Sequence, residues 1–296
     1  MIDRSTALFS EHRDHLVGVA YRMLGSMAEA EDVVQDAYRK WRRVSVETVR
    51  EPRAWLVTTV SRLCLNVLKS ARVKRLVYVG PWLPEPVVTD APVDRNSGLA
   101  DSLSYALLVV LESLNPTERA VFVLREVFDH DFAQIAEIVG KSESNCRQIL
   151  SRARARVMEK RPRFDVASEQ RDAAFESFAQ AARTGDVAAL MNVLADDVKF
   201  TTDGGGRARA LPVALAGAQR VARIIGKLAE RVFPDHRVFR EAEINGLPGL
   251  VSIEHGKVVS VVALGISEGR VSRIYVVTNP EKLARLHDLT KGGGRR

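Results

Sequence analysis

Apolar residues recur at helical spacing along the first quarter of the chain. Positions 16, 17, 20, 21 and 24 fall on one face of an α-helix. Gly25 is placed to end that helix, and Ser26 with Glu29 has the spacing of a capping box that starts a second helix. Pro52 suits the first turn of a third helix, which runs on through "RAWLVTTVSRLCLNVLKSAR". The pattern predicts an all-α domain over residues 1–76.

The helical pattern stops between residues 75 and 97. Four prolines interrupt the run "YVGPWLPEPVVTDAP", and such a run favours extended backbone. Its aromatic residues and Leu83 indicate that the segment docks on another part of the protein. We therefore predict a linker over residues 77–98, followed by a second helical domain over residues 99–163.

A different pattern begins near residue 168. Helical spacing covers roughly residues 168–195 and 214–233, and strand-like runs separated by turn sequences lie between and after these helices. Helices followed by a meander of strands predict an α+β domain over residues 168–290. The last residues, 291–296, read "KGGGRR" and are expected to be disordered.

The composition narrows the class of protein. Hydrophobic residues make up 46% of the 296 residues, which favours packed domains, and the formal net charge of +7 favours a polyanionic partner. The two cysteines, Cys64 and Cys146, fall inside helical patterns, and we expect both to be reduced core residues. The chain begins without an apolar signal region and has no apolar run long enough to span a bilayer. These features predict a cytosolic protein.

Residues 115–158 have the pattern of a helix-turn-helix. The letters "NPTE" favour a capped helix start, and Asp131 is placed to cap a later helix. Gly140 suits the left-handed residue that ends this helix, and Ser142 is placed to cap the next one. In this motif the second helix lies in the DNA major groove. The core residues expected on the first helix of the motif are Ile135, Ala136 and Val139.

The helix after Ser142 has an apolar face and a polar face. The apolar face carries Cys146, Ile149, Leu150, Ala153 and Val157. The other side offers guanidinium, amide and hydroxyl groups, which grip phosphates and read base edges in DNA complexes. A solvated amphipathic helix would look the same, but the capped first helix and the glycine turn favour DNA binding. The candidate DNA-binding residues are Ser144, Arg147, Gln148, Ser151, Arg152 and Arg154.

The third N-terminal helix is a second candidate surface for nucleic acid. Polar and basic side chains lie opposite its apolar stripe, as on many DNA-binding helices, although an ordinary exposed helix face looks the same. These side chains are Thr58, Thr59, Arg62, Asn66, Lys69 and Arg72.

Three segments, in this order, resemble bacterial extracytoplasmic-function (group IV) RNA polymerase sigma factors. They are "AEAEDVVQDAYRKW", "EPRAWLVTTVSRLCLNVLKSAR" and the helix-turn-helix, and the resemblance covers roughly residues 5–160. It implies that the first segment grips core RNA polymerase, that the second recognises and melts the −10 promoter element, and that the helix-turn-helix binds the −35 element. The implied polymerase-binding residues are Asp32, Gln35 and Asp36. Trp55 joins Thr58, Thr59, Arg62, Asn66 and Lys69 in the implied −10 set, although its apolar stripe favours burial of the ring.

The remainder resembles a subgroup of these sigma factors with a C-terminal SnoaL-like domain, an α+β cone of the nuclear-transport-factor-two-like fold. The motifs "WLPEP", "DGGG" and "NPEKL" carry this resemblance. It implies a domain that regulates the sigma factor from within the chain, with no separate anti-sigma factor required. The implied partners are promoter DNA and the β′ clamp helices and β flap of core polymerase, with no membrane. The implied regulatory residues are Trp82, Pro84, Glu85, Asp203, Gly204, Gly205, Gly206, Asn279 and Pro280.

Two other functions remain open from the sequence. A helix-turn-helix regulator that never joins polymerase would use the same DNA-binding helix, although the "AEDVVQDAYRKW" helix argues against it. An isomerase-type enzyme with an attached DNA-binding part would need a carboxylate or histidine tuned by an apolar pocket. Its candidates, which show no diagnostic spacing, are Asp196, Asp197, Asp203, His236, Glu254 and His255. We expect no catalysis, no cofactor and no metal site.

The stretch "TTDGGGRARA", residues 201–210, reads at first like a phosphate-binding loop. It follows a strand-like run but lacks the Gly-Lys-Ser/Thr ending of such loops. We interpret Gly204–Gly206 as a tight turn and expect Asp203 to hydrogen-bond to the linker near Trp82–Pro86. A solvent-exposed hairpin tip is the alternative.

Overall fold

The computed structural model describes residues 4–75, 78–89, 105–160, 168–232 and 237–286. The chain divides into two compact units. The helical unit contains Met1–Val77 and Leu107–Arg161, and the C-terminal unit contains Tyr78–Ala106 and Pro162–Arg296. The linker therefore groups with the C-terminal residues. The tail predicted to be disordered, His236 and part of the predicted linker lie outside the described residues.

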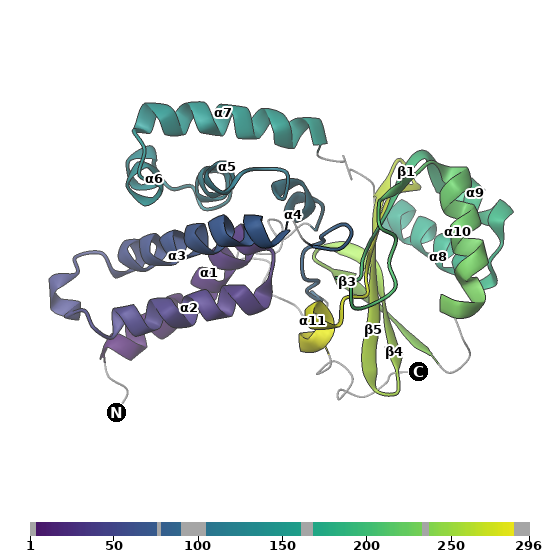
Figure 1. Cartoon of the computed structure of the whole chain (residues 1–296), viewed down its shortest axis with the longest axis horizontal. Coiled ribbons are helices and arrows are strands. Elements are labelled where there is room, and N and C mark those ends of the chain that lie inside the picture. The colour runs from purple at the N-terminus through teal and green to yellow at the C-terminus, as the bar shows by residue number, and fades with distance from the viewer. Residues whose placement is uncertain (1–3, 76–77, 90–104, 161–167, 233–236, 287–296) are drawn as a thin grey trace. The chain divides into compact units, whose positions relative to one another are not determined.

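Three helices form the N-terminal module of the helical unit: α1 (Arg4–Leu24), α2 (Met27–Trp41) and α3 (Pro52–Arg75) (Figure 1). A short 3₁₀ helix, Val46–Thr48, lies between the last two. The expected stop and restart are present, because Gly25 has a φ of 71° and the Ser26 side chain accepts a hydrogen bond from the Glu29 amide. The ring of Trp41, the last residue of α2, is fully buried.

The helix-turn-helix module contains α4 (Tyr105–Leu111), α5 (Pro116–Phe122), a π-helical segment (Val123–Val127), α6 (Phe132–Val139) and α7 (Glu143–Lys160). The boundary between the two compact units falls within α4. The helix-turn-helix prediction is correct.

Local signals set the ends of these helices. Asn115 caps α5 in a capping box, Asp131 caps α6, and Gly140 ends α6 in the left-handed conformation. The Ser142 hydroxyl accepts a hydrogen bond from the amide at the start of α7. One detail of the prediction was wrong. Ile138 is the buried partner of Ile135, whereas Ala136 and Val139 are only half-buried.

Within the described residues, six strands form the sheet of the C-terminal unit, in the order β2-β1-β6-β5-β4-β3. Their bounds are β1 Leu194–Asp203, β2 Leu215–Ala216, β3 Val238–Ile244, β4 Leu247–Glu254, β5 Lys257–Ser267 and β6 Arg270–Val277. β1 runs parallel to β6, and the other pairs are antiparallel.

Helices α8 (Ser168–Thr184), α9 (Val187–Val193) and α10 (Ala218–Val232) pack against one face of the sheet (Figure 1). The short helix α11 (Pro280–Leu283) follows β6. Apolar residues from α8, α9, α10 and the sheet form one core cluster. This is the predicted α+β domain.

The first predicted helix of this domain is divided in two. Gly185 has a φ of 69° and Asp186 caps a new helix, so the expected helix over residues 168–195 becomes α8 and α9. Strand β1 then begins at Leu194, earlier than expected. Asp196 and Asp197 therefore lie on a strand rather than at a helix end, and both are exposed.

Both cysteines are buried and unpaired, as expected for reduced core residues. Among the described helices, none combines the length and the apolar composition that crossing a bilayer requires.

Candidate nucleic-acid interface and linker-binding site

The outer face of α7 presents all six residues of the candidate −35 set to solvent. Ser144, Arg147, Gln148, Ser151, Arg152 and Arg154 are exposed, whereas the apolar residues of the opposite face are buried. Arg147 pairs with Glu143 one turn earlier at 2.9 Å, and Arg154 pairs with Glu126 at 2.7 Å. Exposed guanidinium groups, an amide and hydroxyls on one helix face can contact phosphates and base edges together.

The candidate −10 residues on α3 differ in exposure. Arg62, Asn66 and Lys69 are exposed, whereas Thr58 and Thr59 are half-buried. Trp55 is also half-buried, and its ring lies 5.3 Å from the buried ring of Trp41. The Trp55 ring therefore serves mainly to pack the core of the module, as its place in the apolar stripe indicated.

The candidate polymerase-binding residues share one exposed face of α2. Asp32, Gln35 and Asp36 are exposed, and Asp36 pairs with Arg39 at 2.6 Å. Their neighbours Val33, Val34 and Ala37 are buried in the module.

The two modules of the helical unit pack along a surface that we call the seam. It comprises His15 and Arg22 of α1, Arg62 of α3, and Arg119, Phe128 and Glu137 of the helix-turn-helix module. Arg62 Nη2 donates to the backbone carbonyl of Glu137 at 3.0 Å and lies 3.2 Å from its carboxylate. A residue of the candidate −10 set is thus in contact with the helix-turn-helix module. Nothing in the sequence indicated Glu137, because the two positions are 75 residues apart.

Buried cations form the centre of the seam. The Arg119 side chain is almost fully buried, donates to the backbone carbonyl of Arg22 through two nitrogens at 3.2 Å, and pairs with Glu112. The Arg22 guanidinium lies 4.9 Å from the Phe128 ring centroid, and the His15 imidazole makes an edge contact with the same ring at 5.1 Å.

Burial in the seam disfavours positive charge. It lowers the pKa of Arg22 to about 10. It is also the largest cause that lowers the pKa of His15 to about 4, with further contributions from Arg53, His130, Arg22 and His12. The His15 imidazole is therefore neutral near pH 7.

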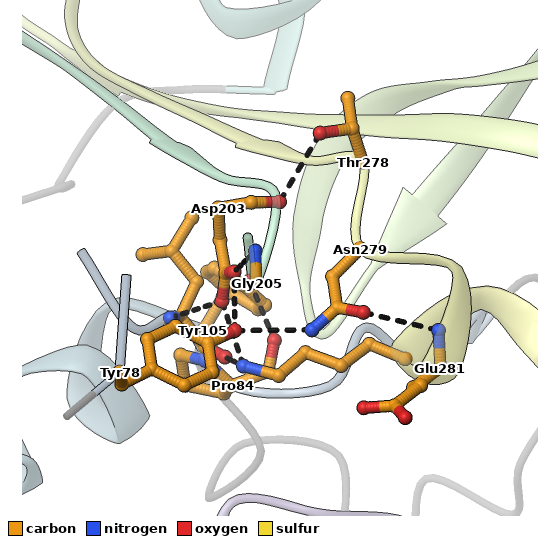
Figure 2. A network of polar contacts seen from close by, with 10 residues as sticks. Tyr78, Pro84, Tyr105, Asp203, Gly205, Thr278, Asn279 and Glu281 are labelled. Carbon is orange, nitrogen blue, oxygen red and sulfur yellow. Dashed lines mark hydrogen bonds and ion pairs between the residues drawn. The ribbon is translucent and has the colours of Figure 1, made fainter. Parts of the chain in front are cut away.

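The carboxylate of Asp203 is the centre of a second site, within the C-terminal unit (Figure 2). The residue is fully buried at the end of β1. Its Oδ1 accepts hydrogen bonds from the Tyr78 hydroxyl at 2.5 Å and the Gly205 amide at 3.0 Å. Its Oδ2 accepts from the Leu83 amide at 2.8 Å and pairs with Lys282 Nζ at 2.7 Å. The hydrogen bond expected between Asp203 and the linker is present, and the exposed hairpin tip is excluded.

The three glycines after Asp203 form a tight turn, as interpreted from the sequence. The Gly204 carbonyl accepts from the amides of residues 207 and 208, and Gly205 and Gly206 have positive φ. A Cβ at Gly205 would overlap the side-chain amide of Asn279, and one at Gly206 would press on Val79. The glycines therefore let the turn pack closely on the linker and the start of α11.

The "NPEKL" motif supplies the other wall of the site. Asn279 caps α11, and its Nδ2 donates to the Tyr78 hydroxyl at 3.0 Å. Pro280 occupies the first turn. Lys282 Nζ lies 3.8 Å from the ring centroid of Trp82 and donates to the Leu83 carbonyl. Burial is the main cause that raises the pKa of Tyr78, so its hydroxyl keeps the proton that it donates to Asp203.

The linker continues along the edge of the sheet. The Val87 amide donates to Asn245 Oδ1 at 2.8 Å, and the Asn245 amide donates to the Val87 carbonyl at 2.9 Å. The Thr89 amide donates to the Glu243 carbonyl at 2.8 Å. This is the addition of an extended segment to a sheet edge.

The first residue of α4 is held by the same domain. The Tyr105 hydroxyl donates to the Pro84 carbonyl at 2.8 Å, its amide donates to the Asn245 carbonyl at 3.1 Å, and its ring lies 5.3 Å from that of Tyr275. Pro84 and Glu85 are buried. The C-terminal domain thus holds the chain near both ends of residues 78–105.

Several residues of this site were not singled out from the sequence. Lys282 lies inside the "NPEKL" motif and Tyr78 lies near the start of the proline-rich run, so the motifs could have identified both residues. Tyr105 and Asn245 gave no signal, because their roles depend on contacts across the tertiary structure.

The candidates for an isomerase-type site do not form a cluster. Asp203 is engaged by the linker, Asp196, Asp197 and His255 are exposed, and Glu254 pairs with Arg237 at 2.7 Å. His236 lies outside the described residues. No group of three or more metal-ligating side chains occurs in the described part of the chain.

Comparison with known proteins accounts for both helical modules. Residues 8–73 match the family "Sigma-70 region 2", and residues 104–157 match the family "Sigma-70, region 4". The N-terminal module and the helix-turn-helix module are therefore the two conserved regions of a sigma factor.

The similarity continues through the C-terminal domain. The chain is 37% identical to the ECF RNA polymerase sigma factor SigJ of Mycobacterium tuberculosis, over 93% of this chain and 91% of that protein. It is 34% identical to a protein of the same organism described as "Probable ECF RNA polymerase sigma factor SigI", over 98% of this chain and 99% of that protein. The crystal structure of M. tuberculosis SigJ matches with a TM-score of 0.75 and 33% identity, and covers 94% of this chain and 98% of that chain. The chain belongs to the extracytoplasmic-function family of RNA polymerase sigma factors.

Proposed function

We propose that this sigma factor reads promoter DNA with α7 and α3, and that its C-terminal domain limits how far these helices can separate. The α7 set contacts the −35 element and the exposed residues of α3 contact the −10 element. The exposed face of α2 binds the β′ clamp helices of core polymerase, and the helix-turn-helix module binds the β flap. The support is that each set lies on one face of one helix, with the apolar residues of that helix turned into a core.

The −35 proposal predicts a loss of base reading when the outer face of α7 is changed. Arg147→Ala removes a side chain that can form two hydrogen bonds to a guanine, so binding to the preferred −35 duplex should weaken by about 1–3 kcal/mol. Fluorescence anisotropy with preferred and scrambled duplexes measures the difference. Arg183→Ala, which removes an exposed arginine of α8, is the matched control. Equal losses on both duplexes would indicate a phosphate contact rather than base reading.

The regulatory proposal rests on one observation. Two groups of the linker, the Tyr78 hydroxyl and the Leu83 amide, donate hydrogen bonds to the buried carboxylate of Asp203. Tyr105, at the other end of the linker, is held by the same domain. The C-terminal domain therefore holds the linker at Tyr78 and again at Tyr105, both of which belong to the same compact unit as that domain.

The length of the linker shows why promoter binding requires its release from the C-terminal domain. Residues 76–104 can extend to about 100 Å, whereas residues 90–104 alone reach only about 50 Å. The −35 and −10 positions are about 25 base pairs apart, which is roughly 85 Å along B-form DNA. A held linker therefore opposes the separation that promoter binding needs, and polymerase must offset the cost by binding the released state more tightly.

Run-off transcription with core polymerase and full-length protein tests the regulation. Asp203→Ala should release the linker and increase the promoter-specific transcript at limiting protein concentration. Asp196→Ala makes the same substitution at an exposed position of the same strand and should leave the transcript unchanged. Equal transcription by the wild type and both variants would contradict regulation through the linker.

The proposed mechanism involves no separate anti-sigma factor, cofactor or catalytic step. Its DNA contacts are made largely by basic side chains, so promoter affinity should fall steeply with salt.

A further inference from the structure

The core of the C-terminal domain contains a cavity of about 300 Å³. It lies between α8, α10 and the sheet, and its walls include Phe178, Phe200, Ile225, Leu250 and Ile274. Protein cores are normally packed to the density of organic crystals. A hollow of this size costs stability because its walls lose contacts on one side. An unfilled core of this kind is therefore a candidate ligand site rather than a packing detail.

Among the described residues, the two charged side chains that line the cavity are both positive. Arg209 is exposed, so it lies at the rim, and Arg237 is partly buried and pairs with Glu254 at 2.7 Å. Ser260 and Thr278 add hydroxyl groups. Counting Glu254 against the two arginines leaves one net positive charge beside an otherwise apolar space.

The described lining contains no carboxylate and no imidazole. Proton transfer to or from a bound molecule would need such a group, so these residues are suited to binding rather than turnover. The carboxylate at the centre of the linker site, Asp203, is not part of the lining. Thr278 of the lining donates to the Asp203 backbone carbonyl at 3.3 Å, so the cavity adjoins the site that holds the linker without including its carboxylate.

We infer that this cavity binds a small apolar molecule with a single carboxylate. The apolar body occupies the space between α10 and the sheet, and the carboxylate meets Arg209 at the rim and Arg237 beside it. Apolar cavities of about 150 Å³ hold benzene, so this one accommodates a body of roughly ten carbon atoms. Its volume is at the lower end of small-molecule sites, which span about 300–1,000 Å³.

Calorimetric titration of the full-length protein tests this inference without any transcription readout. The probes are decanoate below its micellar concentration, 4-butylbenzoate, and decan-1-ol, which keeps the chain but lacks the charge. We expect at least one carboxylate to bind with a stoichiometry of one, and the alcohol to bind about tenfold more weakly. The two acids distinguish an aliphatic from an aromatic ligand. No binding of either acid at millimolar concentration, or equal binding of decanoate and the alcohol, would overturn the assignment.

Two variants locate the bound molecule. Arg209→Gln removes an exposed charge at the rim and should weaken binding of the carboxylate about tenfold, whereas Arg207→Gln, two residues away and outside the lining, should not. Ala182→Phe fills the cavity from α8 and should abolish binding of acid and alcohol alike, with folding checked by circular dichroism. Because Arg209 is exposed, its variant tests the site even if the filled core does not fold. Equal behaviour of the two arginine variants would place the ligand elsewhere.

Discussion

Asp203 of the C-terminal domain and Arg22 of the helical unit are both charged side chains that the fold removes from water. The Asp203 carboxylate accepts three hydrogen bonds and pairs with Lys282, so its charge is matched by opposite charge and by dipoles. The Arg22 guanidinium lies 4.9 Å from the centroid of the Phe128 ring, and Arg119 donates to the Arg22 backbone carbonyl. Hydrogen bonds and an ion pair stabilise the buried Asp203 carboxylate, whereas burial disfavours the charged form of Arg22.

The pKa values of two residues of the seam show this effect of burial. Burial lowers the pKa of Arg22 to about 10 and that of His15 to about 4, and both changes disfavour the charged forms. Separation of the two modules would return these groups to water. The comparison predicts that the linker attachment costs more to break than the seam, so the seam should open first when a partner binds the separated modules more tightly.

The largest expected effect comes from removal of the matched charge. Asp203→Ala deprives three donors of their acceptor and leaves Lys282 buried without its carboxylate. Breaking a buried ion pair in this way costs about 3–5 kcal/mol. Hydrogen exchange should show lost protection at the Leu83 and Val87 amides, and urea unfolding of the C-terminal domain should shift to lower concentration.

The control for this experiment is Asp196→Ala on the same strand, which should change neither measurement. Full protection of the Leu83 amide in Asp203→Ala would show that the sheet-edge contacts hold the linker without the carboxylate. The buried charge of Asp203 would then contribute as little to holding the linker as the buried charge of Arg22 contributes to holding the seam.

Acidification should weaken the seam by a smaller amount. The pKa of His15 is about 4 in the packed structure and 6.5 in its ordinary environment. As the pH falls from 6.5 towards 4, the separated or unfolded state takes up a proton that the packed state does not. The contribution of neutral His15 to stability is therefore present above pH 6.5 and is lost across this interval.

The measurement is urea unfolding of the helical unit at pH 7.5 and pH 5, for the wild type and His15→Gln. Other groups also respond to acid, so only the difference between the two proteins reports on His15. The stability of the wild type should fall more between the two pH values than that of the variant. Parallel falls would show that the imidazole remains hydrated in the seam.

The sequence best predicted those features that depend on interactions between residues close together in the chain. The caps at Asp131 and Asn115 and the left-handed Gly140 act within a few residues, so the helix-turn-helix followed from the letters alone. The same reasoning failed at Gly185, where a glycine inside a helical pattern ends one helix and Asp186 starts another. Helical spacing alone does not distinguish a tolerated glycine from a stop.

The linker site was predictable in part. Asp203 and the glycine turn were identified with the linker as their partner, because the motif letters were distinctive. Lys282 and Tyr105 were not, since a buried lysine or tyrosine looks like a surface residue until a distant carboxylate or carbonyl is placed beside it. Glu137 was missed for the same reason. Tertiary partners of charged residues are the part of a site that local patterns do not contain.

The smallest expected effect concerns the exposed end of the seam. Arg62 and Glu137 are 51% and 69% exposed, so their ion pair should contribute only about 0.2–1 kcal/mol and should weaken with salt. A double-mutant cycle with Arg62→Gln and Glu137→Gln in urea unfolding measures the coupling. The backbone contact from Arg62 to Glu137 survives in the single variant at position 137, so that variant isolates the charge.

This pair also tests whether the seam competes with DNA. If Arg62 contacts the −10 element, Glu137→Gln frees its charge and should increase affinity for −10 DNA by at most about fivefold, with Glu159→Gln at an exposed position of α7 as the control. The increase should disappear when Arg62→Gln is added. An increase that persists without Arg62 would be general relief of repulsion between a carboxylate and DNA. The seam would then compete with DNA only through its position next to Arg62, and not through the Arg62–Glu137 ion pair.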